Sequence, residues 1–237
     1  MRKLALLLMA IVLAGCCGVP SFGGTIGSGR VVDKEYPLTG FDRVEASHAF
    51  QVQVSQAANY SVVVSADDNI LPDVEVTLSG DTLRIGLRPG RNYARATLRA
   101  RIALPSLRGV GLSGASQATI TGFQSSSDLD LHLSGAASLR GDIRAGNLRA
   151  GLSGASRLTL AGSGQRLELN GSGGSNADLL NWPASDAVVH LSGGSRADVN
   201  VSGHLDAELS GGAHLEYAGK PTLGRVETSG GASIHQR

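Results

Sequence analysis

The chain has 237 residues, of which 33 are glycine, 17% are charged and 4% are aromatic, and its formal net charge is +1. No Lys/Arg cluster with interleaved aromatic residues occurs, so nothing in this balance points to a nucleic-acid partner. Hydrophobic residues make up 41% and alternate strictly with polar ones, which argues against disorder.

The N-terminus carries the pattern of a targeting segment. Two basic residues precede an apolar run over 4–13, which is too short to span a bilayer as a helix. The run ends in Leu-Ala-Gly-Cys16, which resembles the bacterial lipoprotein signal, where small residues precede a cysteine that is diacylated and becomes the mature N-terminus. We therefore predict a signal peptide over 1–15 and lipidation of Cys16. The alternative is an ordinary secretory peptide that ends near Cys16.

Residues 16–30 read as the lipidated cysteine followed by a Gly/Ser-rich tether. Cys17 is the one other cysteine, so the folded region contains no disulfide and no thiolate metal site. The position after Cys16 carries no Asp, which favours transport to the outer membrane. We predict a bacterial envelope protein that is lipid-anchored in the outer membrane, and the membrane face stays open.

We predict an N-terminal region of irregularly spaced strands over residues 31–107. Apolar and polar residues alternate over 44–46, 50–54, 60–65, 74–78, 83–87 and 97–104, with turn residues between these runs. We expect this region to pair with and cover the first turn of the repeats that follow, because the open end of a β-coil exposes unpaired backbone groups.

Residues 108–237 contain a repeated phrase in which Ser-Gly is followed by Ala or Gly. Its serines recur about every 19 residues, at Ser113, Ser134, Ser153, Ser172, Ser192, Ser210 and Ser229. A near-constant period of this length is typical of a solenoid in which each repeat is one turn of chain.

Period-two alternation on both sides of the phrase predicts two strands per turn, joined by the Ser-Gly corner. Glycine suits a corner that needs positive φ, and we expect the serine hydroxyls to bond backbone groups or each other there. The prediction is an all-β, right-handed parallel β-helix of six to seven turns, about 30 Å long, with 31–237 as one structural unit. A β-sandwich of hairpins is the alternative.

The lipoprotein box, the segment VVVSADDNILPDVEVTLSGDTLRIGL at 62–87 and the serial LSGAS turns together resemble the head GIN domain family. The resemblance spans about 40–233. Members are bacterial envelope proteins described as autotransporter adhesin heads. The resemblance implies the fold and an adhesin-like role, and it supplies no catalytic residues to carry over.

An outward-facing column of acidic residues is the first candidate site. The sixth residue after successive corner serines is Asp178, Asp198 and Glu216, with Arg196 on a neighbouring position. In register, these carboxylates would stack about 5 Å apart and would repel unless a cation or arginine lies between them. Such a column suits Ca²⁺ or an acidic carbohydrate-active site, and a solvated polar face is the simpler reading. We predict a ligand-binding face there, without a catalytic residue, resident metal or cofactor.

Two further features carry weaker predictions. Trp182 lies in a return loop, where it would stack on a sugar or anchor the loop against the coil. His190 would lie beside Glu208 on the next turn, as a surface pair and not as part of a metal site, which needs three or four converging ligands.

The sequence thus predicts a non-enzymatic, lipid-anchored, adhesin-like module whose partners are the membrane and a glycan or an envelope protein. One rival is a carbohydrate-active enzyme or calcium-dependent glycan binder that uses the Asp178/Asp198/Glu216 column. Another is an envelope spacer without a ligand. The identity of the ligand and the oligomeric state stay open.

Overall fold

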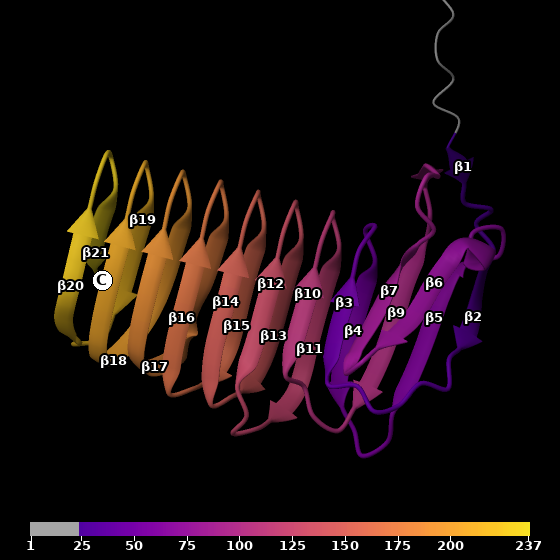
Figure 1. The fold of residues 1–237 in the computed structure, drawn as a ribbon, viewed down its shortest axis with the longest axis horizontal. Helices are drawn as coiled ribbons and strands as arrows, with labels where there is room; N and C mark the ends of the chain where they lie inside the picture. The colour runs from indigo at the N-terminus through magenta and orange to yellow at the C-terminus, as the bar shows by residue number, and fades with distance from the viewer. Residues whose placement is uncertain (1–23) are drawn as a thin grey trace, which may run out of the picture.

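The structure, a computed structural model, describes residues 24–237. Within this range the protein is all-β apart from one turn of 3₁₀ helix, and its strands stack into an elongated coil (Figure 1). The N-terminal elements are β1 (Thr25–Ile26), β2 (Val31–Glu35), β3 (Arg43–Ala46), β4 (Gln51–Gln56), β5 (Ser61–Asp67), η1 (Leu71–Asp73), β6 (Val74–Ser79), β7 (Thr82–Leu87), β8 (Tyr93–Ala94) and β9 (Leu98–Leu104). The repeats contain β10 (Gly109–Leu112), β11 (Gln117–Gln124), β12 (Leu129–Leu133), β13 (Ser138–Arg144), β14 (Asn147–Leu152), β15 (Arg157–Ser163), β16 (Arg166–Gly171), β17 (Asn176–Leu191), β18 (Arg196–Leu209), β19 (His214–Ala218), β20 (Thr222–Thr228) and β21 (Ser233–Gln236).

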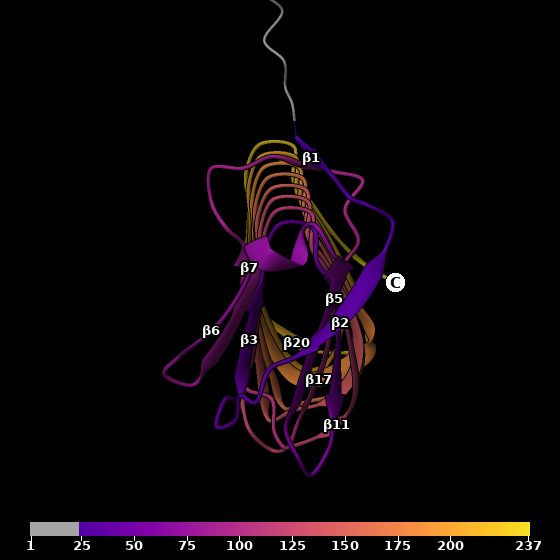
Figure 2. The ribbon, with the colours of Figure 1, turned by 90° about the vertical axis from the view of Figure 1, so that its right-hand side faces the viewer.

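The coil has two walls of parallel strands, one on each side of the Ser-Gly corners, as the view along the stack shows (Figure 2). The pre-corner wall contains, in spatial order, β7, β3, β10, β12, β14, β16, the second halves of β17 and β18, and β20. The post-corner wall contains β9, β4, β11, β13, β15, the first halves of β17 and β18, β19 and β21. The predicted solenoid is confirmed.

Successive turns stack in register, so like residues form columns. Leu112 pairs with Leu133 and that residue with Leu152, and all three are buried. His132 and Gly151 form the neighbouring outward position. The alternation that predicted buried and exposed faces is therefore correct, and each fully buried leucine contributes about 1.5–3 kcal/mol of hydrophobic stabilisation.

The corners stack as tightly as the walls. The seven glycines of the Ser-Gly corners have φ between 68° and 71°. From Gly135 onward, the residue after each of these glycines donates its N–H to the glycine carbonyl of the turn before, as from Ala155 to Gly135 at 2.7 Å. The backbone thus forms its own ladder along the corner.

The corner serine hydroxyls do not form the expected ladder. Within 113–229, where all seven serines are described, the one hydrogen bond donated by these hydroxyls is a long contact of 3.5 Å from Ser172 to the Leu152 carbonyl. The serine backbone N–H groups bond to the previous turn instead, as from Ser134 to Leu112 O at 2.9 Å. The side-chain hydroxyls of these serines are therefore available for contacts on the outer surface of the corners.

The N-terminal region belongs to the coil more than the sequence suggests. β3 and β4 pair in parallel with β10 and β11, and β7 and β9 add a further level on their other side. β6, β5 and β2 then cover this end as antiparallel strands. The predicted boundary at residue 107 thus separates two stretches of one continuous stack, and the cap consists of β2, β5 and β6.

Residues 24–30, the last part of the predicted tether, are bound to the domain. β1 pairs with β8, and the Gly29 N–H donates to the Asp67 carboxylate at 2.7 Å. Ser28 N donates to Asn69 Oδ1 at 3.0 Å. The predicted signal peptide and lipidated Cys16 lie outside the described residues. Over 24–237 there is no helix with the length and apolarity needed to cross a bilayer.

Candidate functional site

The predicted acidic column exists as a geometric feature of the post-corner wall. Asp178 pairs with Asp198 across β17 and β18, and Asp198 pairs with Glu216 across β18 and β19. Arg196 lies two residues before Asp198 and pairs with Asn176 and His214. All of the stacked carboxylates are half-buried.

The middle carboxylate of the column is electrostatically strained. Partial burial raises the pKa of Asp198 above its ordinary value, and repulsion from Glu216 and then Asp178 raises it further. Arg196 and Arg237 lower the pKa and offset part of this effect. The column therefore attracts positive charge, as the sequence suggested.

The column does not form a chelating site. Among the residues that the structure describes, no group of three or more His, Cys, Asp or Glu side chains is arranged to hold a metal ion. Carboxylates on adjacent strands of a flat wall stand side by side about 4.8 Å apart, whereas Ca²⁺ needs six to eight oxygens around one point.

Trp182 is the residue whose placement differs most from the expectation. Its side chain is 1% exposed and its indole Nε1 donates to the Ile143 carbonyl at 3.1 Å. The ring therefore fills the core at the return bend and is not available to stack on a sugar at the surface. The loop-anchor alternative describes its role.

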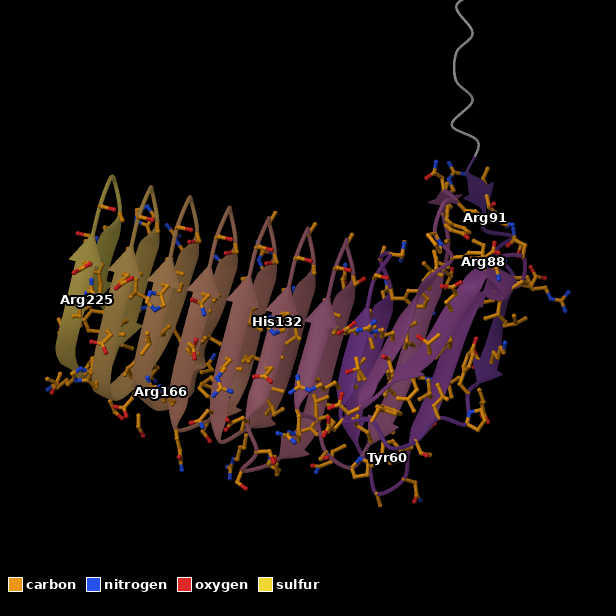
Figure 3. All side chains as sticks on the ribbon, viewed as in Figure 1. Tyr60, Arg88, Arg91, His132, Arg166 and Arg225 are labelled. Atoms are coloured by element: carbon orange, nitrogen blue, oxygen red, sulfur yellow. The ribbon has the colours of Figure 1, made fainter. Side chains whose placement is uncertain are left out.

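A long groove lies on the outer face of the pre-corner wall, and sequence reasoning missed it. Its volume is about 1520 Å³, and residues from β6 and from every level between β7 and β20 line it. The central column of its floor comprises Glu45, Gly111, His132, Gly151, Asn170, His190, Glu208 and Glu227. The corner serines form its upper margin. His132 lies near the middle of this face (Figure 3).

Two glycines help to deepen the groove floor. An added Cβ at Gly151 would lie 3.2 Å from His132 Nδ1, and one at Gly111 would lie 3.0 Å from Glu45 Cγ. The neighbouring side chains therefore lean over the glycines. Outward-facing glycines in the repeat are the sequence signal that could have indicated the groove.

The groove floor is polar, and its charges gather toward the ends. Glu45 contacts Arg84 at 3.0 Å near the N-terminal end, and Glu208 contacts Arg225 at 3.4 Å near the other. His190 Nδ1 lies 3.3 Å from Glu208 Oε2, so the predicted surface pair is confirmed. The middle offers serine hydroxyls at the strand spacing, together with one imidazole and one amide, and these groups suit an elongated ligand rich in hydroxyl groups.

A second hollow is smaller and lies on the opposite wall. Its volume is about 360 Å³ and its lining includes Gln53, Ser61, Arg101 and Thr119. Neither hollow includes a residue of the acidic column. The candidate site of this protein is therefore the groove of the pre-corner wall.

The family model described as "Putative auto-transporter adhesin, head GIN domain" matches residues 40–221. A crystal structure of a "putative adhesin" from Bacteroides fragilis is similar with a TM-score of 0.85 and 20% identity, over 90% of this chain and 100% of that chain. A "putative lipid binding protein" from Parabacteroides distasonis has a TM-score of 0.73 and 15% identity, over 91% and 100%. A "putative adhesin" from Parabacteroides merdae has a TM-score of 0.69 and 14% identity, over 90% and 99%. At these identities the structures show a shared fold alone. No curated protein matches the chain.

Proposed function

Because this chain belongs to the head GIN domain family, we propose that it is a non-enzymatic envelope module that binds an extended partner along the groove of its pre-corner wall. The observation that carries the proposal is the continuity of the groove from the β6–β7 hairpin to β20. A hollow of this length presents a serine hydroxyl at each corner, so it fits a partner that is itself a repeating chain.

The chemistry of the groove favours a neutral glycan. Hydroxyl, amide and imidazole groups in its middle can donate and accept hydrogen bonds, and the flanking acidic residues are largely paired with basic ones. Sugar hydroxyls need such groups, whereas a strongly charged polymer needs a field of one sign.

The membrane attachment is proposed from the sequence. The Leu-Ala-Gly-Cys16 box supports an acylated cysteine, and two or more acyl chains bind a bilayer durably where one binds reversibly. Mass spectrometry of the membrane fraction tests this: we expect the mature chain to begin at an acylated Cys16, and Cys16→Ala to abolish acylation and release the protein from the membrane. A Cys16→Ala variant that stays membrane-bound would contradict the proposal.

A pair of variants on one turn tests the groove. Gly151→Arg fills the groove floor on β14, and Thr159→Arg adds the same charge to the outer face of β15 on the opposite wall. On an array of neutral and charged glycans, with lipid vesicles included because one relative is named as lipid-binding, we expect the Thr159→Arg variant to bind like the unaltered protein. The Gly151→Arg variant should lose binding by tenfold or more.

Three outcomes of that assay count against the groove. Binding that both variants retain places the ligand elsewhere, and binding lost only in Thr159→Arg assigns it to the post-corner wall. No binding to any glycan or vesicle supports the spacer alternative.

A further inference from the structure

The C-terminal end of the stack is an exposed edge. β20 is exposed along its whole length, and the inward-facing Leu223 and Val226 are 47% and 36% exposed, although their counterparts Leu205 and Ala207 one turn earlier are buried. Ile234 on β21 is also only partly buried. Figure 1 shows β20 and β21 at one end of the stack, opposite the end that β2, β5 and β6 cover.

The backbone of this edge has unpaired groups on both strands, and one residue of each strand is decisive. Ser229 donates to Leu209 O and Arg225 N to the Asp206 carboxylate, so these residues face the preceding turn. Because alternate residues of a strand face opposite sides, Val226 between them directs its N–H and C=O away from the coil. On β21, the N–H groups of Ser233 and Arg237 donate to Ala213 O and Tyr217 O of the preceding turn. The backbone N–H and C=O of Ile234 therefore also point away from that turn, toward the open end of the stack.

Val226 and Ile234 lie at equal distances from the corner. Each is four residues from Gly230, one before it and one after it, so they stand at the same height on the two walls. A single twofold axis perpendicular to the walls passes through both positions. Rotation about it would bring β20 against β20 and β21 against β21 of a second copy, in both cases antiparallel.

The charges of β20 are self-complementary about the same axis. Arg225 and Glu227 flank Val226 and already contact each other at 2.8 Å. In an antiparallel pair centred on Val226, Arg225 of each copy lies opposite Glu227 of the other, on the outer face of the wall. Val226 and Ile234 of both copies then close the open end of the core.

We propose that the protein forms a twofold symmetric dimer through its C-terminal edge, by pairing of β20 with β20 and of β21 with β21. The N-terminal end does not offer the same surface, because the antiparallel strands β2, β5 and β6 cover it. The assembly therefore closes at two copies and does not grow into a filament.

Charge reversal on β20 provides the test. We expect the purified chain to sediment as a dimer at micromolar concentration. Glu227→Arg places two arginines opposite two arginines, and Arg225→Glu does the same with glutamates, so each variant alone should dimerise at least about tenfold more weakly. An equimolar mixture of the two variants restores opposite charges at every position and should sediment as a heterodimer.

A proline variant separates edge pairing from surface charge. Val226→Pro removes an N–H that faces away from the coil, so dimerisation should be lost while its thermal unfolding matches that of the monomeric Glu227→Arg variant. A monomer at 100 µM for the unaltered chain would overturn the proposal. A dimer that survives Val226→Pro, or two charge variants that fail to associate when mixed, would also overturn it.

Discussion

The corner glycines satisfy two constraints at one residue. Each has a backbone conformation that L side chains rarely adopt, and each lies against the corner of the turn before. A Cβ on Gly154 would approach the Gly135 carbonyl oxygen to 2.6 Å, which requires movement of the backbone. A side chain at a corner glycine would force adjacent turns apart, because the hydrogen bonds between successive corners use the same glycine carbonyl groups.

Alanine at Gly154 should therefore be strongly destabilising. The strain of an alanine in the left-handed conformation and the displacement of the Gly135 carbonyl together should lower the free energy of unfolding by about 2–4 kcal/mol, measured by chemical denaturation. Gly174→Ala is the matched control, since its Cβ would lie 3.9 Å from the nearest carbonyl oxygen and the equivalent positions already hold Ala115, Ala136 and Ala155. Equal effects of the two substitutions would refute the argument.

Asp198 should make stability depend on pH. Its folded-state pKa is raised above the ordinary value of 3.8, so it favours folding when protonated, and this contribution is lost as the pH rises through the folded-state pKa. Asp198→Asn should thus raise the melting temperature at pH 7, and the difference should vanish below pH 3.8. Glu168→Gln, which removes a carboxylate 3.6 Å from Arg149, should give no such gain. A destabilised Asp198→Asn variant at pH 7 would contradict the prediction.

At the scale of the elements, the sequence did not indicate the corner between β3 and β4, because this corner lacks glycine. Ser47-His48-Ala49 joins β3 to β4, and both His48 and Ala49 have positive φ. This corner is less crowded than the others: a Cβ on Gly114 would meet His48 N at 3.5 Å, and the His48 ring lies against the end of β7. The period therefore predicted the later turns, and the first turn was assigned to a cap although its strands were placed correctly.

The return bends explain why the sequence left two roles open for Trp182. Alternation predicts which side chains point inward along a straight strand, but β17 continues through the bend with register shifts between 179 and 186. A large ring there packs wherever the neighbouring turn leaves space. Here that space faces Gly164, where an added Cβ would overlap the indole. Such complementarity between turns is not visible in one repeat.

The segment over 24–30 should depend on one buried carboxylate. Asp67 is 1% exposed and accepts hydrogen bonds from Gly29 N at 2.7 Å and Thr97 N at 2.6 Å. Asp67→Ala leaves two donors without this acceptor, and we expect a loss of about 1–3 kcal/mol in unfolding free energy. Limited proteolysis should then cut within 24–30. The adjacent, more exposed Asp68 contacts Ser28 and Arg30, and Asp68→Ala should change both readouts much less.

For the whole molecule, stacking predicts that turns can be removed as units. Deletion of 154–172 joins Ser153 to Gly173 and preserves the register of both walls, because it removes one full period. Circular dichroism should show a folded β protein with a reduced free energy of unfolding. Deletion of 154–163 removes only about half a period and joins a corner to a return, and it should not fold. A folded half-turn variant would show that register is not the constraint.

The groove also belongs to the whole molecule. No single repeat contains it, since its floor is a column drawn from many strands and its margin from a row of corners. The sequence predicted the stacked acidic column because those residues are conspicuous by charge. It did not predict the groove, whose floor depends on missing side chains at Gly111 and Gly151 and on neighbours that lean across them.

The segment Gly24–Ile26 is bound beside β8. The stack therefore extends in a fixed direction from any attachment that lies before this segment in the chain. The segment lies at the end of the stack far from β20 (Figure 1). Nine strand levels at about 4.8 Å put the two ends about 40 Å apart. A dimer joined at β20 would carry its attachment points at opposite tips, about 80 Å apart. Such a dimer would therefore hold its two points of attachment at a fixed separation.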